Sequence, residues 1–335
     1  MASPKGGVGK REAFCVFRGR YNIIIRYNIP VMNKNLTKIA ESTDTLLQKA
    51  SEVFDLLDIS ENTRAEYKAR VFMFLERTQK KGLNSNSFLE FKRELEKRAD
   101  LSIATKNKYL ATAKIFLKEL NRRGIIPVDI TQNIKTFKQD KKHKREGLNE
   151  AEIQLLSQKM RELLPTPSNA RTKAILSLLA LQGLRQIEIV RLNFKDLDFA
   201  AKTAFVQGKG RDDREAIDLH PETIRNLREY LKANRIADGA LFASKSNNSR
   251  GKRITTRALR GIIKTILTEL KIDKTTHGFR HYFTSKLIET YKGDLLEVAR
   301  YTRHKSLEML QVYNDNIKRK ADLPRYYETF EEIKF

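Results

Sequence analysis

The sequence contains a single cysteine, Cys15, which allows neither an internal disulfide nor a zinc site built from cysteines. It also lacks any run near the ~20 apolar residues that a membrane-spanning helix needs. The longest early apolar run, Ile23–Ile25, is stopped by Arg26 and is not followed by the small residues of a cleavage site, which argues against a secretory signal. These absences predict an intracellular, cytoplasmic protein that does not act at a membrane.

Acidic residues are the other shortage. The 41 Asp and Glu stand against 66 Lys and Arg, so the net charge is +25 and the isoelectric point is about 10.0. An apolar fraction of 40% is enough to build cores, which excludes a collagen-like or wholly disordered chain. Because the basic residues are spread along the whole chain rather than gathered in one amphipathic helix, nucleic acid is favoured over an anionic membrane as the partner.

The length of 335 residues predicts two domains, at roughly 150 residues each. Residues 1–34 are basic and show no sustained period, so we expect a poorly ordered tail. Because Met32 precedes the start of helical patterning, residues 1–31 are either a basic arm or an extension in front of the natural start. A helical domain over 35–128, a basic linker over 129–147 and a second domain over 148–335 complete the predicted division.

The helical domain is predicted from apolar residues that recur at steps of three and four across 36–123. Ser87 and Ser102 are suited to start its third and fourth helices. Lysines on its outer surface are expected to contact DNA, among them Lys106 and Lys108.

The linker is strongly basic between positions 135 and 146. One interpretation is a solvated tether, and the other is a basic strap that lies along DNA phosphates. The net charge of +25 favours the strap. The linker residues expected to bind DNA are Lys135, Lys138, Lys141, Lys142, Lys144 and Arg145.

The second domain is predicted to be mostly helical around one buried helix. Residues Ala174–Leu181 are apolar almost all round, which is typical of a central helix. Strand-like segments follow at 197–199, 203–206 and 216–219, and the last two are joined by a Gly-containing loop that suits a hairpin. Further helices are expected over 221–233, 255–270 and 277–300. The predicted fold class is therefore α+β, mainly α with a small antiparallel β-sheet.

Two familiar motifs are incomplete. Lys5–Lys10 is similar to a phosphate-binding P-loop, but no strand precedes it and Arg11 replaces the hydroxyl residue that would bind Mg²⁺. His277 and His281 are four residues apart, but Gly278 stands where a zinc protease needs glutamate. We therefore expect neither a nucleotide site nor a metal site.

A dispersed set of polar residues in the second domain stands out instead. Taken singly, each has an ordinary explanation, such as a core arginine paired with a carboxylate or a solvated lysine in a turn. The members are Arg185 at the end of the buried helix with Glu188 three residues on, Lys209 at the hairpin tip, His277 and Arg280 at a helix start, His304, and Tyr313 nine residues later.

In this order the residues resemble the tyrosine recombinase, or phage integrase, family. The family's hallmark is an arginine, a lysine on a β-hairpin, His-x-x-Arg, a histidine or tryptophan, and a tyrosine nine residues further on; every element is present. The preceding helical domain is similar to the family's core-binding domain in placement and pattern. One departure is Thr302–Arg303 before the second histidine, where the family usually has Leu-Gly.

The resemblance implies a site that breaks and rejoins DNA strands. Arg185 and Arg280 would hold the phosphate, because guanidinium groups match its charge and geometry, and His304 would donate to a nonbridging oxygen. Tyr313 would attack phosphorus to give a 3′-phosphotyrosine and a free 5′-hydroxyl.

The same resemblance assigns the proton transfers. Lys209 would protonate the leaving 5′-oxygen, and His277 would help to deprotonate the tyrosine. Glu188 would orient Arg185. Because the phosphotyrosyl bond conserves the energy needed for rejoining, neither ATP nor a metal is implied.

Three functions are open at this point. A site-specific recombinase would act as a homotetramer on two specific double-stranded DNA sites, would be a monomer or dimer when free, and would be found with the nucleoid. It would serve integration or excision of a mobile element, dimer resolution or transposition. A type IB topoisomerase shares the chemistry but relaxes supercoils as a monomer, and a non-catalytic DNA-binding protein would keep only the fold. The complete residue set and the separate helical domain favour the recombinase.

The C-terminal tail carries an apolar stripe, with Leu323, Tyr327 and Phe330 at i, i+4 and i+7. We expect a break at Pro324 and a short segment beyond it. The stripe either folds back on its own domain or, as the resemblance implies, docks on a neighbouring subunit. A polar hinge in front of the stripe favours docking in trans, because it lets the segment reach.

Overall fold

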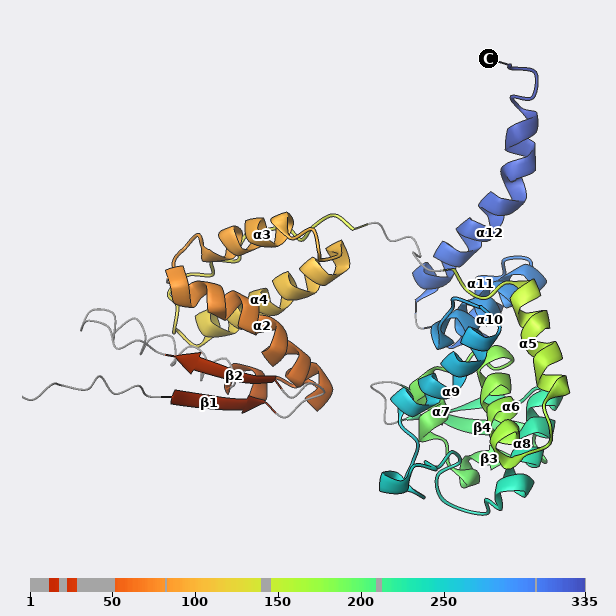
Figure 1. Cartoon of the computed structure of the whole chain (residues 1–335). Helices are drawn as coiled ribbons and strands as arrows, with labels where there is room; N and C mark the ends of the chain where they lie inside the picture. The colour runs from red at the N-terminus through yellow and green to blue at the C-terminus, as the bar shows by residue number, and fades with distance from the viewer. Residues whose placement is uncertain are drawn as a thin grey trace, which may run out of the picture. The chain divides into compact units, whose positions relative to one another are not determined.

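The chain divides into two units, residues 1–140 and 141–335, each with its own apolar core (Figure 1). The structure is a computed structural model that describes residues 12–17, 23–28, 52–81, 83–139, 146–208, 213–304 and 306–334. The predicted fold class is confirmed, because the described elements are mainly helices with a small antiparallel sheet in the second unit.

The predicted N-terminal tail contains regular structure. Strands β1 (Glu12–Phe17) and β2 (Ile23–Asn28) pair antiparallel, with Phe14 opposite Arg26 and Cys15 opposite Ile25. Our expectation of a poorly ordered segment over 1–34 differs from this result at 12–17 and 23–28, and the remaining residues of that segment lie outside the described residues. Both strands are rich in aromatic and β-branched residues, which favour extended pairing, and the basic residues between them obscure that pattern.

The first unit is built from α2 (Glu61–Lys81), α3 (Ser87–Lys97) and α4 (Ile103–Arg122). The predicted starts at Ser87 and Ser102 are confirmed, and the Ser102 hydroxyl accepts a hydrogen bond from the Thr105 amide at 3.2 Å. Buried Phe54, Phe74 and Phe116 lie in the core between these helices. Of the predicted first helix, only the helical turn at 52–55 lies within the described residues.

The first half of the predicted linker belongs to this unit. Ile130, Ile134 and Phe137 pack against its core. The backbone of Phe137 is also held by the Asn107 side chain, which accepts from Phe137 N at 2.8 Å and donates to its carbonyl at 3.0 Å. The predicted boundary at 129 is therefore too early, because the lysines between these apolar residues hide their spacing. Lys135 and Lys138 remain exposed there.

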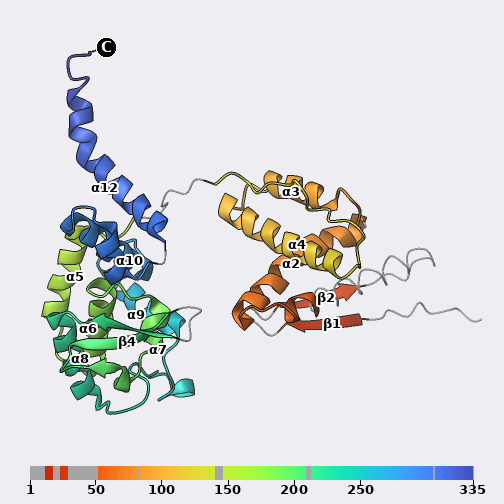
Figure 2. The ribbon, with the colours of Figure 1, turned by 180° about the vertical axis from the view of Figure 1, so that it is seen from behind.

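The second unit surrounds the buried helix α6 (Pro167–Ala180), as the sequence predicts. Helix α8 (Pro221–Asn234) packs along it, and α9 (Thr256–Glu269) and α10 (Thr276–Thr290) also contact it. Figure 2 shows α6 and α8 side by side from behind. Helix α5 (Glu150–Glu162) begins at the predicted cap, where Asn149 and Glu152 exchange side-chain-to-backbone hydrogen bonds of 2.8 Å.

The small sheet of this unit has the order β3-β4-β5 and is antiparallel throughout. Its strands are Leu197–Asp198, Thr203–Gln207 and Arg214–Asp218, close to the predicted segments. In β4 the buried Ala204 and Val206 alternate with the exposed Phe205, so one face of the strand meets the core.

Three further helices complete the unit: α7 (Gln186–Arg191), α11 (Leu295–Thr302) and α12 (Leu307–Glu328). The predicted break at Pro324 is wrong, because α12 continues through it. The proline removes one backbone donor, but this part of α12 is exposed all round, so water can satisfy the carbonyl left without a partner. No helix in the described ranges has both the length and the apolar character to cross a membrane.

Candidate active site

Arg185 stands at the start of α7, where the chain turns out of the buried helix α6. Glu188 accepts from the Arg185 backbone amide at 2.8 Å and from its Nη1 at 2.9 Å, so the i+3 spacing seen in the sequence is a real contact. Glu188 is only 2% exposed, whereas the Arg185 side chain is 37% exposed. One face of this guanidinium is therefore fixed by the protein and another is open to solvent.

Arg280 is the buried centre of the site. It lies on α10, is 3% exposed, and donates from Nη1 to the Gly183 carbonyl at 2.7 Å and from Nη2 to the Thr302 carbonyl at 2.5 Å. Burial, and next the charge of Arg185, lower its pKa to about 10, so it stays charged at neutral pH. Arg280 thus ties the turn before Arg185 to the end of α11, next to His304.

The backbone at Gly183 is required for this arrangement. Its φ is +57°, in the left-handed region, and a Cβ there would lie 2.3 Å from the Phe283 ring. A larger residue would displace the carbonyl that Arg280 uses.

The surroundings of His304 favour its neutral form. The Thr302 hydroxyl donates to the Val298 carbonyl at 2.9 Å, so its oxygen must accept from His304 Nδ1, 2.8 Å away. The donor count therefore assigns the proton to Nδ1 and leaves Nε2, 3.5 Å from Arg280 Nη2, as an acceptor. Burial, followed by the positive charge of Arg280, lowers the pKa of His304 to about 3.

Tyr313 lies on α12 within a small apolar cluster with Ile288, Val298 and Leu310. Its hydroxyl is 2.5 Å from His281 Nδ1. Burial raises the pKa of Tyr313 to about 12, and the charge of Arg280 opposes this only in part. The phenol is thus protonated and held at neutral pH.

His281 is one residue that the sequence analysis did not assign to the chemistry. Its ring packs edge-on against that of His277, with centroids 4.5 Å apart, so the pair spaced at i and i+4 shares one face of α10. His277 also lies near enough to His304 to help lower the pKa of His304. The spacing of the two histidines at i and i+4 is the sequence signal for this shared face.

Arg303 is the second residue that the sequence analysis left without a role. Its side chain is 4% exposed, and Nη2 lies 2.8 Å from Glu188 Oε2. The signal was its place in the motif, because it stands where the family usually has glycine. Arg185, Glu188, Arg280, Arg303 and His304 therefore form one connected group.

Lys209 lies outside the described residues, as do Lys141, Lys142, Lys144 and Arg145. The root of the Lys209 loop is described: Arg191 Nη1 donates to the Gly208 carbonyl at 2.7 Å. Of the lysines expected to bind DNA from the first unit, Lys108 is exposed, and Lys106 donates to the Glu96 carbonyl at 2.9 Å.

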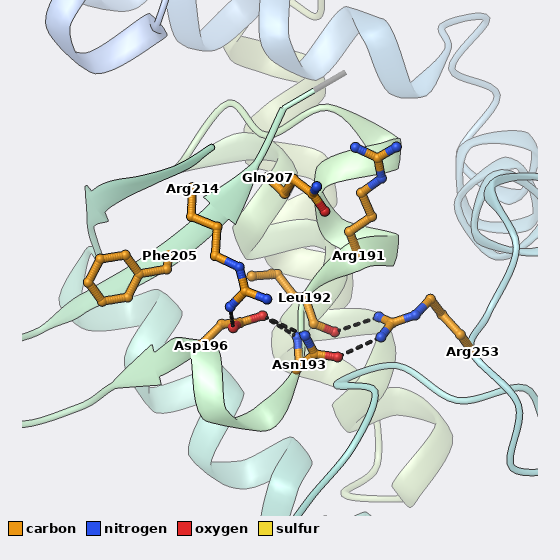
Figure 3. A pocket seen from close by; sticks show the side chains of 8 residues that line it. All are labelled: Arg191, Leu192, Asn193, Asp196, Phe205, Gln207, Arg214 and Arg253. Carbon is orange, nitrogen blue, oxygen red and sulfur yellow. Dashed lines mark hydrogen bonds and ion pairs between the residues drawn. The ribbon is translucent and has the colours of Figure 1, made fainter. Parts of the chain in front are cut away.

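A cavity of about 190 Å³ lies beside the end of β4, and its lining includes Arg191, Arg214 and Arg253 (Figure 3). Arg253 donates to the Leu192 carbonyl at 2.9 Å, and Arg214 pairs with Asp196 at 2.5 Å. Arg191 thus holds the end of β4 to α7, Arg214 holds β5 to the turn at Asp196, and Arg253 holds the segment before α9 to the end of α7. None of the residues predicted to do chemistry lines the cavity.

Comparison with known proteins identifies the family of the chain. The phage integrase family profile matches residues 146–320. Tyrosine recombinase XerC of Roseiflexus castenholzii is 30% identical over 270 residues, which are 77% of this chain and 84% of that protein. Tyrosine recombinase XerD of Oceanobacillus iheyensis is 31% identical over 240 residues, which are 68% and 76% of the two chains.

Two solved structures share the fold. One is the XerH site-specific recombinase bound to a palindromic difH substrate in a post-cleavage complex, with a TM-score of 0.67 and 18% identity over 84% of this chain and 96% of that one. The other is a lambda integrase dimer bound to a COC′ core site, with a TM-score of 0.62 and 13% identity over 81% and 94%.

A helical unit followed by a unit that gathers two arginines, a histidine and a tyrosine defines an enzyme that cleaves and rejoins DNA. The chain belongs to the phage integrase family. It is a tyrosine site-specific recombinase of the kind to which XerC and XerD belong.

Proposed function

We propose that Tyr313 attacks the scissile phosphorus and forms a 3′-phosphotyrosyl bond, while Arg185 and Arg280 hold the phosphate. The observation that carries this proposal is the placement of Arg280, whose guanidinium binds the turn before Arg185 and the residue two before His304. A pentacoordinate transition state carries more charge on its equatorial oxygens than the ground state, and fixed guanidinium groups stabilise that charge.

His304 needs a second proton to donate to the phosphate through Nε2, because Nδ1 already donates to Thr302. The negative charge of a bound phosphate favours uptake of that proton. The role implied by the resemblance is therefore available only when DNA is in the site.

The two proton transfers are assigned to Lys209 and the histidine pair. Lys209 protonates the leaving 5′-oxygen from the hairpin loop, whose root is fixed by the bond from Arg191 to Gly208. His281 holds the Tyr313 hydroxyl before DNA binds, and His277 accepts the proton during attack. In this scheme the Tyr313 hydroxyl gives up its hydrogen bond to His281, and its oxygen then forms a covalent bond to phosphorus.

The substrate is double-stranded DNA with specific sites, and the active assembly is a homotetramer built from monomers or dimers on two duplexes. Supporting this, the XerH and lambda integrase structures hold recombination-site DNA. The exposed apolar residues at and just beyond the end of α12, which include Tyr327 and Phe330, also suit docking on a neighbouring subunit. Integration, dimer resolution and transposition share this chemistry, and an enzyme acting on such DNA is found with the nucleoid.

The test begins with Tyr313→Phe protein, which binds without cleaving and therefore selects a target site from random duplexes. A nicked duplex carrying the selected site then traps the covalent intermediate. Wild-type protein and the exposed control Tyr301→Phe should form a denaturant-resistant adduct, and Tyr313→Phe should form none. An adduct with Tyr313→Phe would refute the assignment.

A second assay separates the recombinase from the topoisomerase alternative. Wild-type protein should exchange strands between two plasmids that each carry the selected site. Relaxation of supercoils on a plasmid without that site, together with no exchange between paired sites, would favour the type IB topoisomerase.

A further inference from the structure

The backbone of Arg303 has an unusual conformation for an arginine. It ends α11 with φ 56° and ψ 40°, in the left-handed region where glycine most often closes a helix. Its side chain nevertheless turns inward and is 4% exposed. Closing the helix does not require a left-handed arginine or a buried guanidinium charge, so the role of this side chain lies in its contacts.

The contacts of Arg303 point to Glu188. Arg303 Nη2 lies 2.8 Å from Glu188 Oε2, while Arg185 Nη1 lies 2.9 Å from Oε1 of the same carboxylate. Within the described residues, Nε and Nη1 of Arg303 have no hydrogen-bond acceptor. The Arg303 side chain therefore does not serve to bind backbone carbonyls. Its one described partner is the carboxylate of Glu188, which Arg185 also contacts.

This sharing changes the charge of the site. Arg185, Arg280 and Arg303 carry three positive charges against the single negative charge of Glu188, so the group keeps two net positive charges. Without Arg303, Glu188 would cancel one of the two arginines proposed to face the phosphate, and the group would keep only one. Because the group is largely buried, water screens this difference weakly.

We propose that Arg303 is a positioning residue that occupies Glu188 and so keeps the charge of Arg185 available to the scissile phosphate. The inference rests on the proposed roles of Arg185 and Arg280. Arg303 does not touch the phosphate; it sets how much positive charge its neighbours present there.

The experiment measures single-turnover cleavage of two nicked duplexes carrying the site selected above. One has the natural phosphodiester at the scissile position, and the other has a methylphosphonate, which is uncharged there. The variants are Arg303→Gln, Arg303→Lys and Arg303→Gln combined with Glu188→Gln. Arg303→Gly fits the left-handed backbone and serves as a second neutral variant if the Arg303→Gln protein does not fold. The matched control is Arg300→Gln, one turn earlier on α11, with a side chain that is 76% exposed.

Loss of the charge should slow cleavage of the phosphodiester by about tenfold or more. The rate on the methylphosphonate should stay within about twofold of the wild-type rate on that substrate, because the methylphosphonate lacks the negative charge of the phosphodiester and its transition state carries one charge fewer. Arg303→Lys should keep most of the activity, the double variant should regain activity relative to Arg303→Gln, and Arg300→Gln should match the wild type.

Equal losses on the two substrates would show a merely structural role and overturn the inference, as would a wild-type rate of Arg303→Gln on the phosphodiester. A double variant no faster than Arg303→Gln would also overturn it. Failure of the proposed function looks different: wild-type protein would then form no adduct on the phosphodiester, and the inference would fall with it.

Discussion

Acid should destabilise the second unit through His304. The pKa of this buried ring is lowered from 6.5 to about 3 in the folded state. As the pH falls below 6.5 the unfolded chain takes up a proton at His304 and the folded chain does not, so the fold loses stability down to about pH 3. Between pH 7 and pH 5 this single group removes about 2 kcal/mol from the free energy of unfolding.

The assay compares the wild type with His304→Gln, which cannot titrate at this position. Urea unfolding at the two pH values, followed by the methyl resonances of the buried Leu179, reports on the second unit alone. The wild type should lose about 2 kcal/mol more than the variant on acidification. Equal losses in the two proteins would refute the reasoning.

The same histidine can be observed directly. The chain has five histidines, so the Cε1 proton of His304 can be assigned by its loss in His304→Gln. In the free protein this resonance should not shift between pH 8 and pH 5. In the complex of Tyr313→Phe protein with its selected DNA site, the midpoint should move upward, because the phosphate favours the charged ring. Titration of the free protein with a midpoint near 6.5 would show that the ring is not held neutral by its surroundings.

Three other perturbations test separate parts of the structure. Cleavage by Lys209→Ala should be largely rescued by a 5′-bridging phosphorothiolate, whose leaving group needs no proton, whereas Arg280→Ala should not be rescued; equal rescue would contradict both roles. Truncation after Lys320 removes the exposed stripe and should leave binding and cleavage of one duplex intact while abolishing two-site exchange; exchange at the wild-type rate would exclude docking in trans. Gly183→Ala should lower the free energy of unfolding by about 2–4 kcal/mol, from the left-handed backbone and the clash with Phe283, and an unchanged urea midpoint would contradict this.

The fold was predictable from the sequence wherever local chemistry decides the structure. Ser102 and Asn149 start their helices because their side chains bond amides three residues on, which the sequence displays directly. The segments that differ have two causes, lysines that hide an apolar pattern and a proline in an exposed helix. The lysines around Ile134 and Phe137 suggested a tether, although the apolar residues pack on the first unit. Pro324 suggested a break that an exposed helix can avoid.

In the candidate site, too, contacts within one helix could be predicted from the sequence, and contacts between helices could not. The contact between Arg185 and Glu188 follows from their spacing at the start of one helix. The bond between His281 and Tyr313 joins α10 to α12, and the bond between Arg303 and Glu188 joins the end of α11 to α7. Such contacts depend on how the helices pack, which no local pattern reveals.

The continuity of α12 has a mechanical consequence. Tyr313 and the exposed residues around Tyr327 belong to one unbroken helix, so the buried tyrosine proposed as the nucleophile and a solvent-exposed segment about 20 Å away are parts of the same element. As long as the helix stays intact, a partner that turned its exposed end about the helix axis would also tend to turn Tyr313. The hydrogen bond between the Tyr313 hydroxyl and His281 Nδ1 is one contact that such a turn would strain. If Tyr313 is the nucleophile, as proposed, a partner bound to the exposed end of α12 is expected to influence when strand cleavage occurs.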